Sequence, residues 1–313
     1  MNDAEADRPI LVTGGDATYF PMIEELLASI RAAAPSPPPA LGVVDAGLTP
    51  EQAESLRAAG VLVVRPPLQP FFPAAALRAR PALAANLAKP WLDRLFPGHA
   101  VIVWLDGDTW VQDYAAVVLL VGAARTGGLA ITSDANRSWE RPIAVRWLLG
   151  GLWGLAQVRS FNFKNGRHAG LPLSVLKDLA TRPLLHAGAY ALRADAPHWE
   201  AMRRWQAKIL RRGKPFTSDQ LAMALAVHTD GLDLQLLPET CNYIHPWLFD
   251  PAQGVLVEAW YPHAKVGIVH LAGQKRMRFD PEATIEVMGL DRRLYTLSLR
   301  YGTFRRMAAA IAA

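Results

Sequence analysis

The chain of 313 residues contains a single cysteine, Cys241. One thiol excludes an internal disulfide framework and a zinc site built from several cysteines, and it is typical of proteins in reducing compartments. The longest apolar runs, residues 115–124 and 147–156, have about half of the roughly 20 residues that a membrane-spanning helix needs. Residues 1–9 are polar and mostly acidic, unlike a secretory signal. We therefore expect no transmembrane helix and a cytoplasmic location.

Charged residues are also scarce, at 19% of the chain, whereas 51% is apolar. This composition excludes a disordered chain and indicates one or two folded cores. The net charge is +5, and the excess is local, because residues 137–214 hold fifteen basic and four acidic side chains. That segment predicts a positive surface, for which nucleotide phosphates, a polyanion and an anionic membrane face are all candidate partners.

Short apolar strands alternate with amphipathic helices along much of the chain, without an internal repeat. Continuous apolar strands separated by helices indicate an α/β fold, with a Rossmann-like, mainly parallel central sheet flanked by helices in a single domain. Thr49 to Gln52 predict a capped helix start. The expected strands are residues 10–13, 41–44, 61–64, 100–105, 128–132, 188–192 and 266–269, with another near 234, and the main expected helices are 22–30, 82–96, 197–211 and 218–226.

Two aspartates follow the most apolar of these strands, in the sequence Asp106-Gly107-Asp108. Residues i and i+2 of an extended segment point the same way, so both carboxylates can approach one cation, and Gly107 lets a ligand come close to the backbone. Carboxylates suit Mg²⁺ or Mn²⁺, which bridge them to substrate phosphates. An isolated pair of this kind is usually only a polar turn. Its place at the carboxyl end of a central strand, where open α/β sheets bind ligands, favours a metal site.

His270 is the histidine best placed to be a third ligand, because it ends the apolar strand 266–269. Gly273, Lys275 and Arg276 follow it and can supply phosphate-neutralising charge. We treat the other histidines as structural. The predicted metal ligands are Asp106, Asp108 and His270.

The order of these motifs resembles the metal-dependent retaining glycosyltransferases of family 8, which have a GT-A fold and include glycogenin and bacterial lipopolysaccharide galactosyl- and glucosyltransferases. The resemblance covers most of the chain. Besides the aspartate pair, it rests on a first strand that ends in Asp-x-x-Tyr, on an Asp-Gln pair that opens a helix, and on a histidine followed three residues later by glycine. These elements are Asp16 and Tyr19, Asp219 and Gln220, and His270 and Gly273.

Three positions depart from the family pattern. Lys89 stands where arginine is more common, and His186 replaces the asparagine of an Asn-Ala-Gly segment that ends here at Gly188. Arg276 replaces the lysine of the last motif, and the Pro-Trp that follows in the family is absent. A cation is kept at both basic positions, whereas sugar recognition at His186 is put in doubt.

The resemblance implies a nucleotide-diphosphate sugar donor, with UDP-sugar expected first, and a divalent metal, Mn²⁺ before Mg²⁺. It implies transfer of a hexose, with retention, to a hydroxyl of a glycan, lipopolysaccharide or other surface polysaccharide. It gives Asp219 and Gln220 a catalytic role at the sugar, as stabilising or positioning groups. The residues implied in nucleotide-sugar binding are Thr13, Asp16, Tyr19, Lys89, Asp106, Gly107, His186, Gly188, Gly273, Lys275 and Arg276.

Tryptophans and basic residues are crowded together between residues 133 and 182, among them Trp139, Trp147 and Trp153. This pattern is compatible with a core that has a solvated rim, with an acceptor-side surface, or with an interfacial membrane patch. A peripheral position at the inner membrane face is therefore one expectation for the protein.

Within one continuous domain we expect a tail (1–9), a nucleotide-sugar-binding half (10–132), an acceptor-side half (133–280) and a C-terminal helical extension (281–313). Two other function classes stay open. The departures at His186 and after Arg276 are compatible with a catalytically silent relative that binds nucleotide. The basic segment is compatible with a nucleic-acid-binding protein, although no recognition motif accompanies it, and we expect no nucleic-acid partner.

Overall fold

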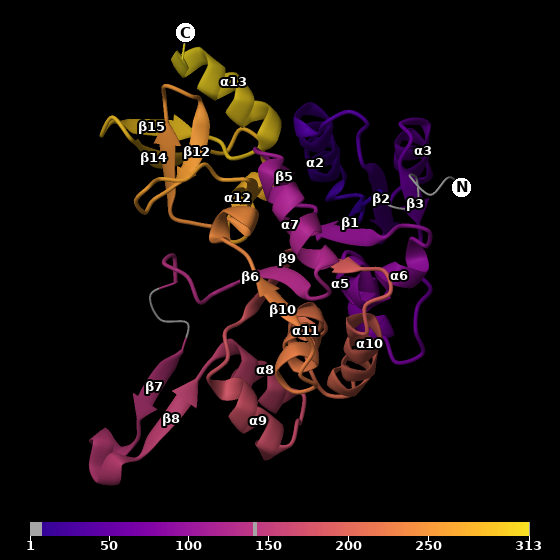
Figure 1. Ribbon diagram of the computed structural model, residues 1–313, viewed down its shortest axis with the longest axis vertical. Helices are drawn as coiled ribbons and strands as arrows, with labels where there is room; N and C mark the ends of the chain where they lie inside the picture. Colours follow the sequence, from indigo (N-terminus) through magenta and orange to yellow (C-terminus); the bar gives the residue numbers. More distant parts are fainter. Residues whose placement is uncertain (1–7, 140–142, 313) are drawn as a thin grey trace.

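A seven-stranded sheet forms the centre of the computed structural model, which describes residues 8–139 and 143–312 (Figure 1). Its strand order is β10-β6-β9-β4-β1-β2-β3. Every pairing in it is parallel except those of β9, which runs antiparallel to both β4 and β6. The strands are β1 (Ile10–Gly15), β2 (Ala40–Asp45), β3 (Leu62–Val64), β4 (Val101–Leu105), β6 (Leu129–Ser133), β9 (Leu185–Arg193) and β10 (Leu234–Leu236). The predicted α/β class with a mainly parallel sheet is confirmed.

Helices cover both faces of this sheet. Successive strand residues point to opposite faces, and apolar side chains on both faces pack against helices. Ile10 and Val12 of β1 belong to one hydrophobic cluster, whereas Leu11 between them belongs to a second cluster on the other face. The first cluster includes side chains of α5 (Leu83–Ala88), α10 (His198–Ile209) and α11 (Ser218–His228). The second includes side chains of α2 (Phe20–Ala33), α3 (Pro50–Ala58) and α7 (Ala115–Arg125). Thr49 and Gln52 form the predicted capping box at the start of α3.

A smaller four-stranded sheet, of order β12-β11-β14-β15, follows the central one in the chain. It consists of β11 (Trp247–Asp250), β12 (Val255–Glu258), β14 (Ile285–Gly289) and β15 (Leu294–Leu297), and helix α13 (Tyr301–Ala312) ends the chain beside it (Figure 1). The extension expected to be helical over 281–313 contains the strands β14 and β15, and only its last part, α13, is a helix. In β14, buried Val287 and Gly289 alternate with exposed Glu286 and Met288, which is the two-residue period of a strand.

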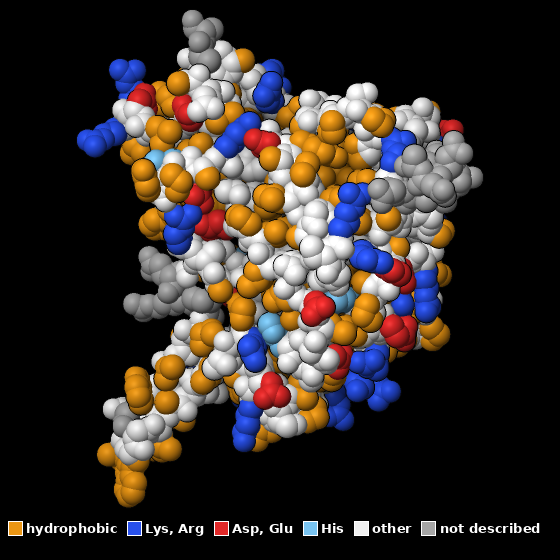
Figure 2. Space-filling model, in the orientation of Figure 1, with side chains coloured by type: hydrophobic (Ala, Val, Ile, Leu, Met, Phe, Trp, Pro, Cys, Tyr) orange, Lys and Arg blue, Asp and Glu red, His pale blue; other side chains and the backbone are white. Residues whose placement is uncertain are grey.

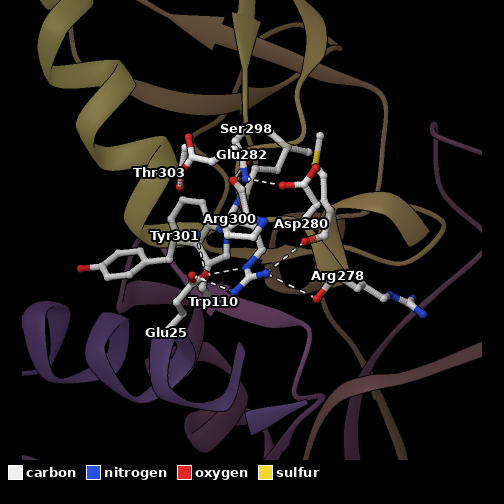
Figure 3. A network of polar contacts seen from close by, with 12 residues as sticks. Glu25, Trp110, Arg278, Asp280, Glu282, Ser298, Arg300, Tyr301 and Thr303 are labelled. Atoms are coloured by element: carbon white, nitrogen blue, oxygen red, sulfur yellow. Dashed lines mark hydrogen bonds and ion pairs between the residues drawn. The ribbon is translucent and has the colours of Figure 1, made fainter. Parts of the chain in front are cut away.

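Arg300 joins this C-terminal region to the first half of the chain (Figure 3). Its buried guanidinium makes two hydrogen bonds of 2.9 Å to the carboxylate of Glu25 on α2. It also donates to the carbonyl oxygens of Met277 and Arg278 in α12 (Lys275–Phe279), at 3.1 and 3.4 Å. A bidentate, buried pair of this kind has a fixed geometry, so it holds the backbone of α12 in place.

A hairpin of β7 (Ala144–Trp147) and β8 (Ala156–Arg159) projects from the molecule near α8 (Phe161–His168) and α9 (Leu173–Ala180) (Figure 1). Trp147 and Trp153 are exposed on it, so the core interpretation is wrong for these two tryptophans. In the part of the chain that the structure describes, no helix is long and apolar enough to cross a membrane. The short elements that remain are α4 (Ala74–Ala79), η1 (Lys89–Trp91), α6 (Leu92–Leu95), β5 (Thr109–Val111), η2 (Leu149–Gly154), η3 (Pro215–Thr217), η4 (Glu239–Asn242) and β13 (Ile268–His270).

Candidate functional site

A pocket lies at the carboxyl ends of β1 and β4, which is the side where open α/β sheets bind ligands. Glycines of both strand ends form part of its wall, and side chains from α11, β13 and α12 close it. The predicted site residues that line it are Tyr19, Asp106, Gly107, Asp108, His186, Gly188, Gln220 and His270. Residues as far apart in the sequence as Tyr19 and His270 therefore meet in one pocket.

The two aspartates and His270 form a compact cluster in this pocket. Nε2 of His270 lies 3.5 Å from Oδ1 of Asp108 and 3.9 Å from Oδ2 of Asp106. One ligand atom from each residue lies within 4.8 Å of the other two. The antiparallel pairing of β13 with β5 creates this cluster, because it places His270 directly opposite Thr109, the residue after Asp108.

Asn242 orients the imidazole of His270. The Asn242 side-chain nitrogen donates to the carbonyl oxygen of His186 at 3.2 Å, which turns its Oδ1 toward His270. Oδ1 then accepts a hydrogen bond of 2.8 Å from Nδ1 of His270. With Nδ1 turned to Asn242, Nε2 faces the two carboxylates and is the nitrogen left to bind a metal. Sequence reasoning did not find Asn242, since only the register of β13 brings it to His270.

Gly188 makes room for His270. A Cβ atom at this position would lie 2.4 Å from Cε1 and 2.7 Å from Nδ1 of the imidazole, closer than real Cβ contacts. The glycine also accepts a hydrogen bond of 2.7 Å from the backbone nitrogen of Asp106. Gly188 therefore sets the distance between β9 and the cluster, in addition to lining the pocket.

We expect Gly188→Ala to displace His270 and to lower Mn²⁺ affinity ~10–100-fold, as second-shell changes typically do. Titration calorimetry with MnCl₂ measures the effect. Gly122→Ala in α7 is the matched control, because its Cβ would meet nothing within 4 Å. The control should keep its metal affinity and lose no stability, since alanine favours a helix interior. Equal affinity of the Gly188→Ala variant and the wild type would show that His270 is not a ligand.

Arg278 is a site residue that the sequence did not reveal. Its Nη2 atom lies 2.7 Å from Oδ2 of Asp108, and its side chain lines the pocket, away from the Arg300 network (Figure 3). Burial alone would raise the pKa of Asp108, but His270 and Arg278 outweigh it and lower that pKa to about 2. Asp108 is therefore a carboxylate at neutral pH.

The three residues of the predicted diphosphate-binding tail do not line the pocket. Gly273, Lys275 and Arg276 are exposed, and the guanidinium of Arg276 lies 3.9 Å from Asp280 instead. Arg276 and Arg278 are two residues apart on a short helix, and two helical residues differ by about 200° in direction. The rotation of α12 thus brings Arg278, rather than Arg276, into the site.

Lys89 lies next to the cluster, is bonded to protein groups only, and is 2% exposed. Its ammonium group lies 2.9 Å from Asp106 Oδ1, from Asp219 Oδ2 and from the carbonyl oxygen of Ala187. Burial alone would lower the pKa of Lys89, but the carboxylates of Asp106 and Asp219 outweigh burial and raise it. All three ammonium protons have protein acceptors, so the lysine positions Asp106 rather than offering a free charge to phosphate.

The Asp219-Gln220 pair opens α11, as the sequence predicted. The Gln220 side chain lines the pocket, whereas Asp219 is buried behind it against Lys89. Burial raises the pKa of Asp219, and Lys89 offsets only part of this effect. Its second oxygen, Oδ1, is buried without a hydrogen-bond partner among the described residues.

The residues after β1 divide between structural and pocket positions. Asp16 accepts hydrogen bonds from the backbone nitrogens of Thr18 and Ala82, at 3.0 and 3.2 Å, so its carboxylate holds two loops together. Tyr19 lines the pocket beside the glycines of β1. Thr13 is buried within β1, and its hydroxyl has no hydrogen-bond partner among the described residues.

His186 lies in the pocket wall, with its ring centroid 5.5 Å from that of Trp139. Burial, with smaller contributions from His270 and His245, lowers the pKa of His186 from 6.5 to about 4. The imidazole is therefore neutral at pH 7. A neutral imidazole can both donate and accept a hydrogen bond.

This lowered pKa predicts acid sensitivity. Between pH 6.5 and 4 the unfolded chain binds a proton at His186 that the folded chain excludes, so stability falls as the pH falls through this window. At ~1.4 kcal/mol per pKa unit, we expect His186 to account for a loss of roughly 3 kcal/mol. Urea unfolding of the wild type and of His186→Asn across this pH window measures the contribution of His186 to the free energy of unfolding. Parallel pH profiles of the two proteins would contradict the prediction.

No protein-family model and no curated protein sequence matches the chain. Several solved glycosyltransferase structures are similar to it. Galactosyltransferase LgtC, solved with donor and acceptor sugar analogues, is 13% identical, with 97% of this chain and 96% of that chain covered and a TM-score of 0.49. The bifunctional glycosyltransferase WbbM is 15% identical, with 87% of this chain and 47% of that chain covered and a TM-score of 0.48. Mouse xyloside xylosyltransferase 1 is 13% identical, with 84% of this chain and 96% of that chain covered and a TM-score of 0.45.

Proposed function

We propose that this chain is a metal-dependent glycosyltransferase. It would move a hexose from a nucleotide-diphosphate sugar, UDP-sugar first, to a hydroxyl of a glycan, lipopolysaccharide or other surface polysaccharide, with retention at the anomeric carbon. The observation that carries the proposal is the cluster of Asp106, Asp108 and His270 at the carboxyl end of β4, in a pocket that also contains two arginines and a glutamine.

The residues of the cluster fit a divalent cation. Two carboxylates and one imidazole match the preferences of Mn²⁺, and an all-oxygen set would suit Mg²⁺ better. Nε2 of His270 is the free nitrogen, because Asn242 occupies Nδ1. A cation held by Asp106, Asp108 and His270 would act as a Lewis acid on the diphosphate leaving group.

The pocket supplies fixed groups around the donor. Arg80 and Arg278 both line the pocket, and Arg278, next to Asp108, is positioned to contact the diphosphate. The hydrogen bonds that Arg300 makes to the α12 backbone keep Arg278 in the pocket wall. Tyr19 lies by the strand ends where the nucleoside would bind. Lys89 holds Asp106 in a single orientation, so the carboxylate need not reorganise during the reaction.

Gln220 and Asp219 are the groups assigned to the sugar. Gln220 lines the pocket, and its amide would hydrogen-bond a sugar hydroxyl or the ring oxygen. A hydroxyl of the sugar would donate a hydrogen bond to the unpartnered Oδ1 of Asp219. This bond would remove the cost of leaving a buried carboxylate oxygen without a partner. Both would position the oxocarbenium-like sugar.

We expect Asp219→Asn to lower kcat by ~10²-fold while changing donor affinity much less, because charge stabilisation of the sugar matters most in the transition state. Steady-state kinetics separates kcat from KM, and calorimetry gives donor affinity. Asp230→Asn is the matched control, since Asp230 binds Arg204 and Trp205 on α10, away from the pocket. If binding and turnover fell together, Asp219 would be a donor-binding residue only.

The function is tested by incubating the full chain with a panel of nucleotide sugars and MnCl₂, and by following release of the nucleoside diphosphate. We expect slow hydrolysis of one donor, lost with a chelator, and thermal stabilisation by the matching nucleoside diphosphate with Mn²⁺. Stabilisation without cleavage of any donor, with or without glycan acceptors, would indicate a silent nucleotide-binding protein. Stabilisation by oligonucleotides alone would indicate a nucleic-acid-binding protein.

A further inference from the structure

The β7–β8 hairpin carries a dense group of large apolar side chains to its tip. Figure 2 shows them in orange along the projection at the lower left, far from the smaller sheet at the upper left. Trp153 is 87% exposed, Leu149 76% and Trp147 61%. Exposed aromatic and aliphatic side chains gathered on one projecting element mark an interaction surface.

The strand pairing divides the hairpin into two faces. Val145 is paired with Val158 and Trp147 with Ala156, so these apolar side chains share one face. The register also pairs Arg146 with Gln157, which places polar side chains on the opposite face. The hairpin is therefore amphipathic along its length and apolar at its end.

The tip holds its largest side chains outward. Leu149 and Trp153 have left-handed backbone conformations, with φ of 49° and 61°, which are uncommon for large side chains. Gly150 and Gly154 follow them in the same region of φ. No packing against the rest of the protein offsets the unfavourable backbone conformation of these two residues, because both are among the most exposed in the described chain.

The charged side chains of the hairpin and of α8 have one sign. Residues 143–177 contain no aspartate or glutamate. Arg159, Lys164 and Arg167 line a pocket together with Phe161 and Phe163 at the base of the hairpin. Cations that surround an apolar element complement the phosphates and the negative surface potential of an anionic leaflet.

We propose that the β7–β8 hairpin docks this protein on an anionic phospholipid bilayer. Its apolar tip, with Trp147 and Trp153, enters the interfacial region, and the basic side chains at its base contact lipid phosphates. A second copy of the chain fits this surface less well, because an isologous contact through the hairpin would bring the cations of both copies together without acidic partners. The inference is independent of the proposed function.

Vesicle sedimentation of the full chain tests the proposal, with vesicles of phosphatidylglycerol and phosphatidylcholine in equal amounts and vesicles of phosphatidylcholine alone. We expect binding to the mixed vesicles, a blue shift of tryptophan emission, and weakening by added salt. Leu149→Ser with Trp153→Ser should reduce vesicle affinity at least ~10-fold, because apolar contacts anchor an interfacial element. Arg159→Gln with Lys164→Gln should abolish the preference for the mixed vesicles.

Leu294→Ser is the matched control, because Leu294 is also an exposed leucine but lies on β15, in the smaller sheet. This variant should bind vesicles like the wild type. Each variant changes exposed side chains, and its thermal unfolding and donor hydrolysis should match the wild type, so a failure here is separate from a failure of the proposed function. Unchanged vesicle binding by the tip variant would overturn the proposal, as would a wild type that ignores vesicles and self-associates through the hairpin.

Discussion

Replacing Asp108 by asparagine is expected to reduce donor cleavage and sugar transfer by at least ~10²–10³-fold, because it removes a charged group at the centre of the electrostatic site. The asparagine keeps the shape of the side chain but leaves Arg278 and His270 without their shared carboxylate. The response to Mn²⁺ should disappear with the activity. Initial rates over a range of MnCl₂ concentrations, together with calorimetric titration of the metal, measure both effects.

Asp280→Asn is the control for a lost negative charge near the site. Asp280 lies two residues after Arg278, and its ion pair with Arg276 is long, at 3.9 Å. An asparagine there can still accept the hydrogen bond that Asp280 receives from the backbone nitrogen of Glu282. We expect wild-type turnover and metal response. Undiminished turnover of a nucleotide sugar by Asp108→Asn would refute the metal site.

The cluster of Asp106, Asp108 and His270 could be predicted because it follows from strand positions. A carboxylate pair directly after the most apolar strand must lie at the carboxyl edge of the sheet, and His270 ends another apolar strand. The hydrophobic pattern likewise predicted β1, β4, α10 and α11 nearly at their observed bounds. Periodicity does not encode strand direction, however, so the antiparallel placement of β9 required the structure.

The groups that surround the cluster could not be predicted from local patterns. Arg278 enters the site only because α12 is held at one rotation by Arg300 and Glu25, which lie 275 positions apart in the sequence. Lysine is almost never fully buried, so the sequence indicated a phosphate contact for Lys89 rather than an internal one. The short strands of the smaller sheet have four or five residues each, too few for a clear alternation.

Lys89→Met is expected to have the largest effect on stability. It leaves Asp106 and Asp219 as two carboxylates that share one cavity without a cation, and removing one partner of a buried ionic group typically costs ~3–5 kcal/mol. Urea unfolding at neutral pH measures the loss. Lys208→Met on α10 is the control, because Lys208 is exposed and its ammonium group lies over the ring of Trp205.

The pH dependence and a double variant separate an electrostatic cause from lost packing. Without Lys89, less offsets the burial that raises the pKa of Asp219, so the folded variant binds a proton there more readily than the unfolded chain. Its stability deficit should therefore shrink as the pH falls toward 5. Adding Asp219→Asn to Lys89→Met should recover part of the loss at neutral pH, because one unpaired charge is removed. A deficit that is equal at both pH values and unchanged in the double variant would mean that Lys89 stabilises the fold through packing alone.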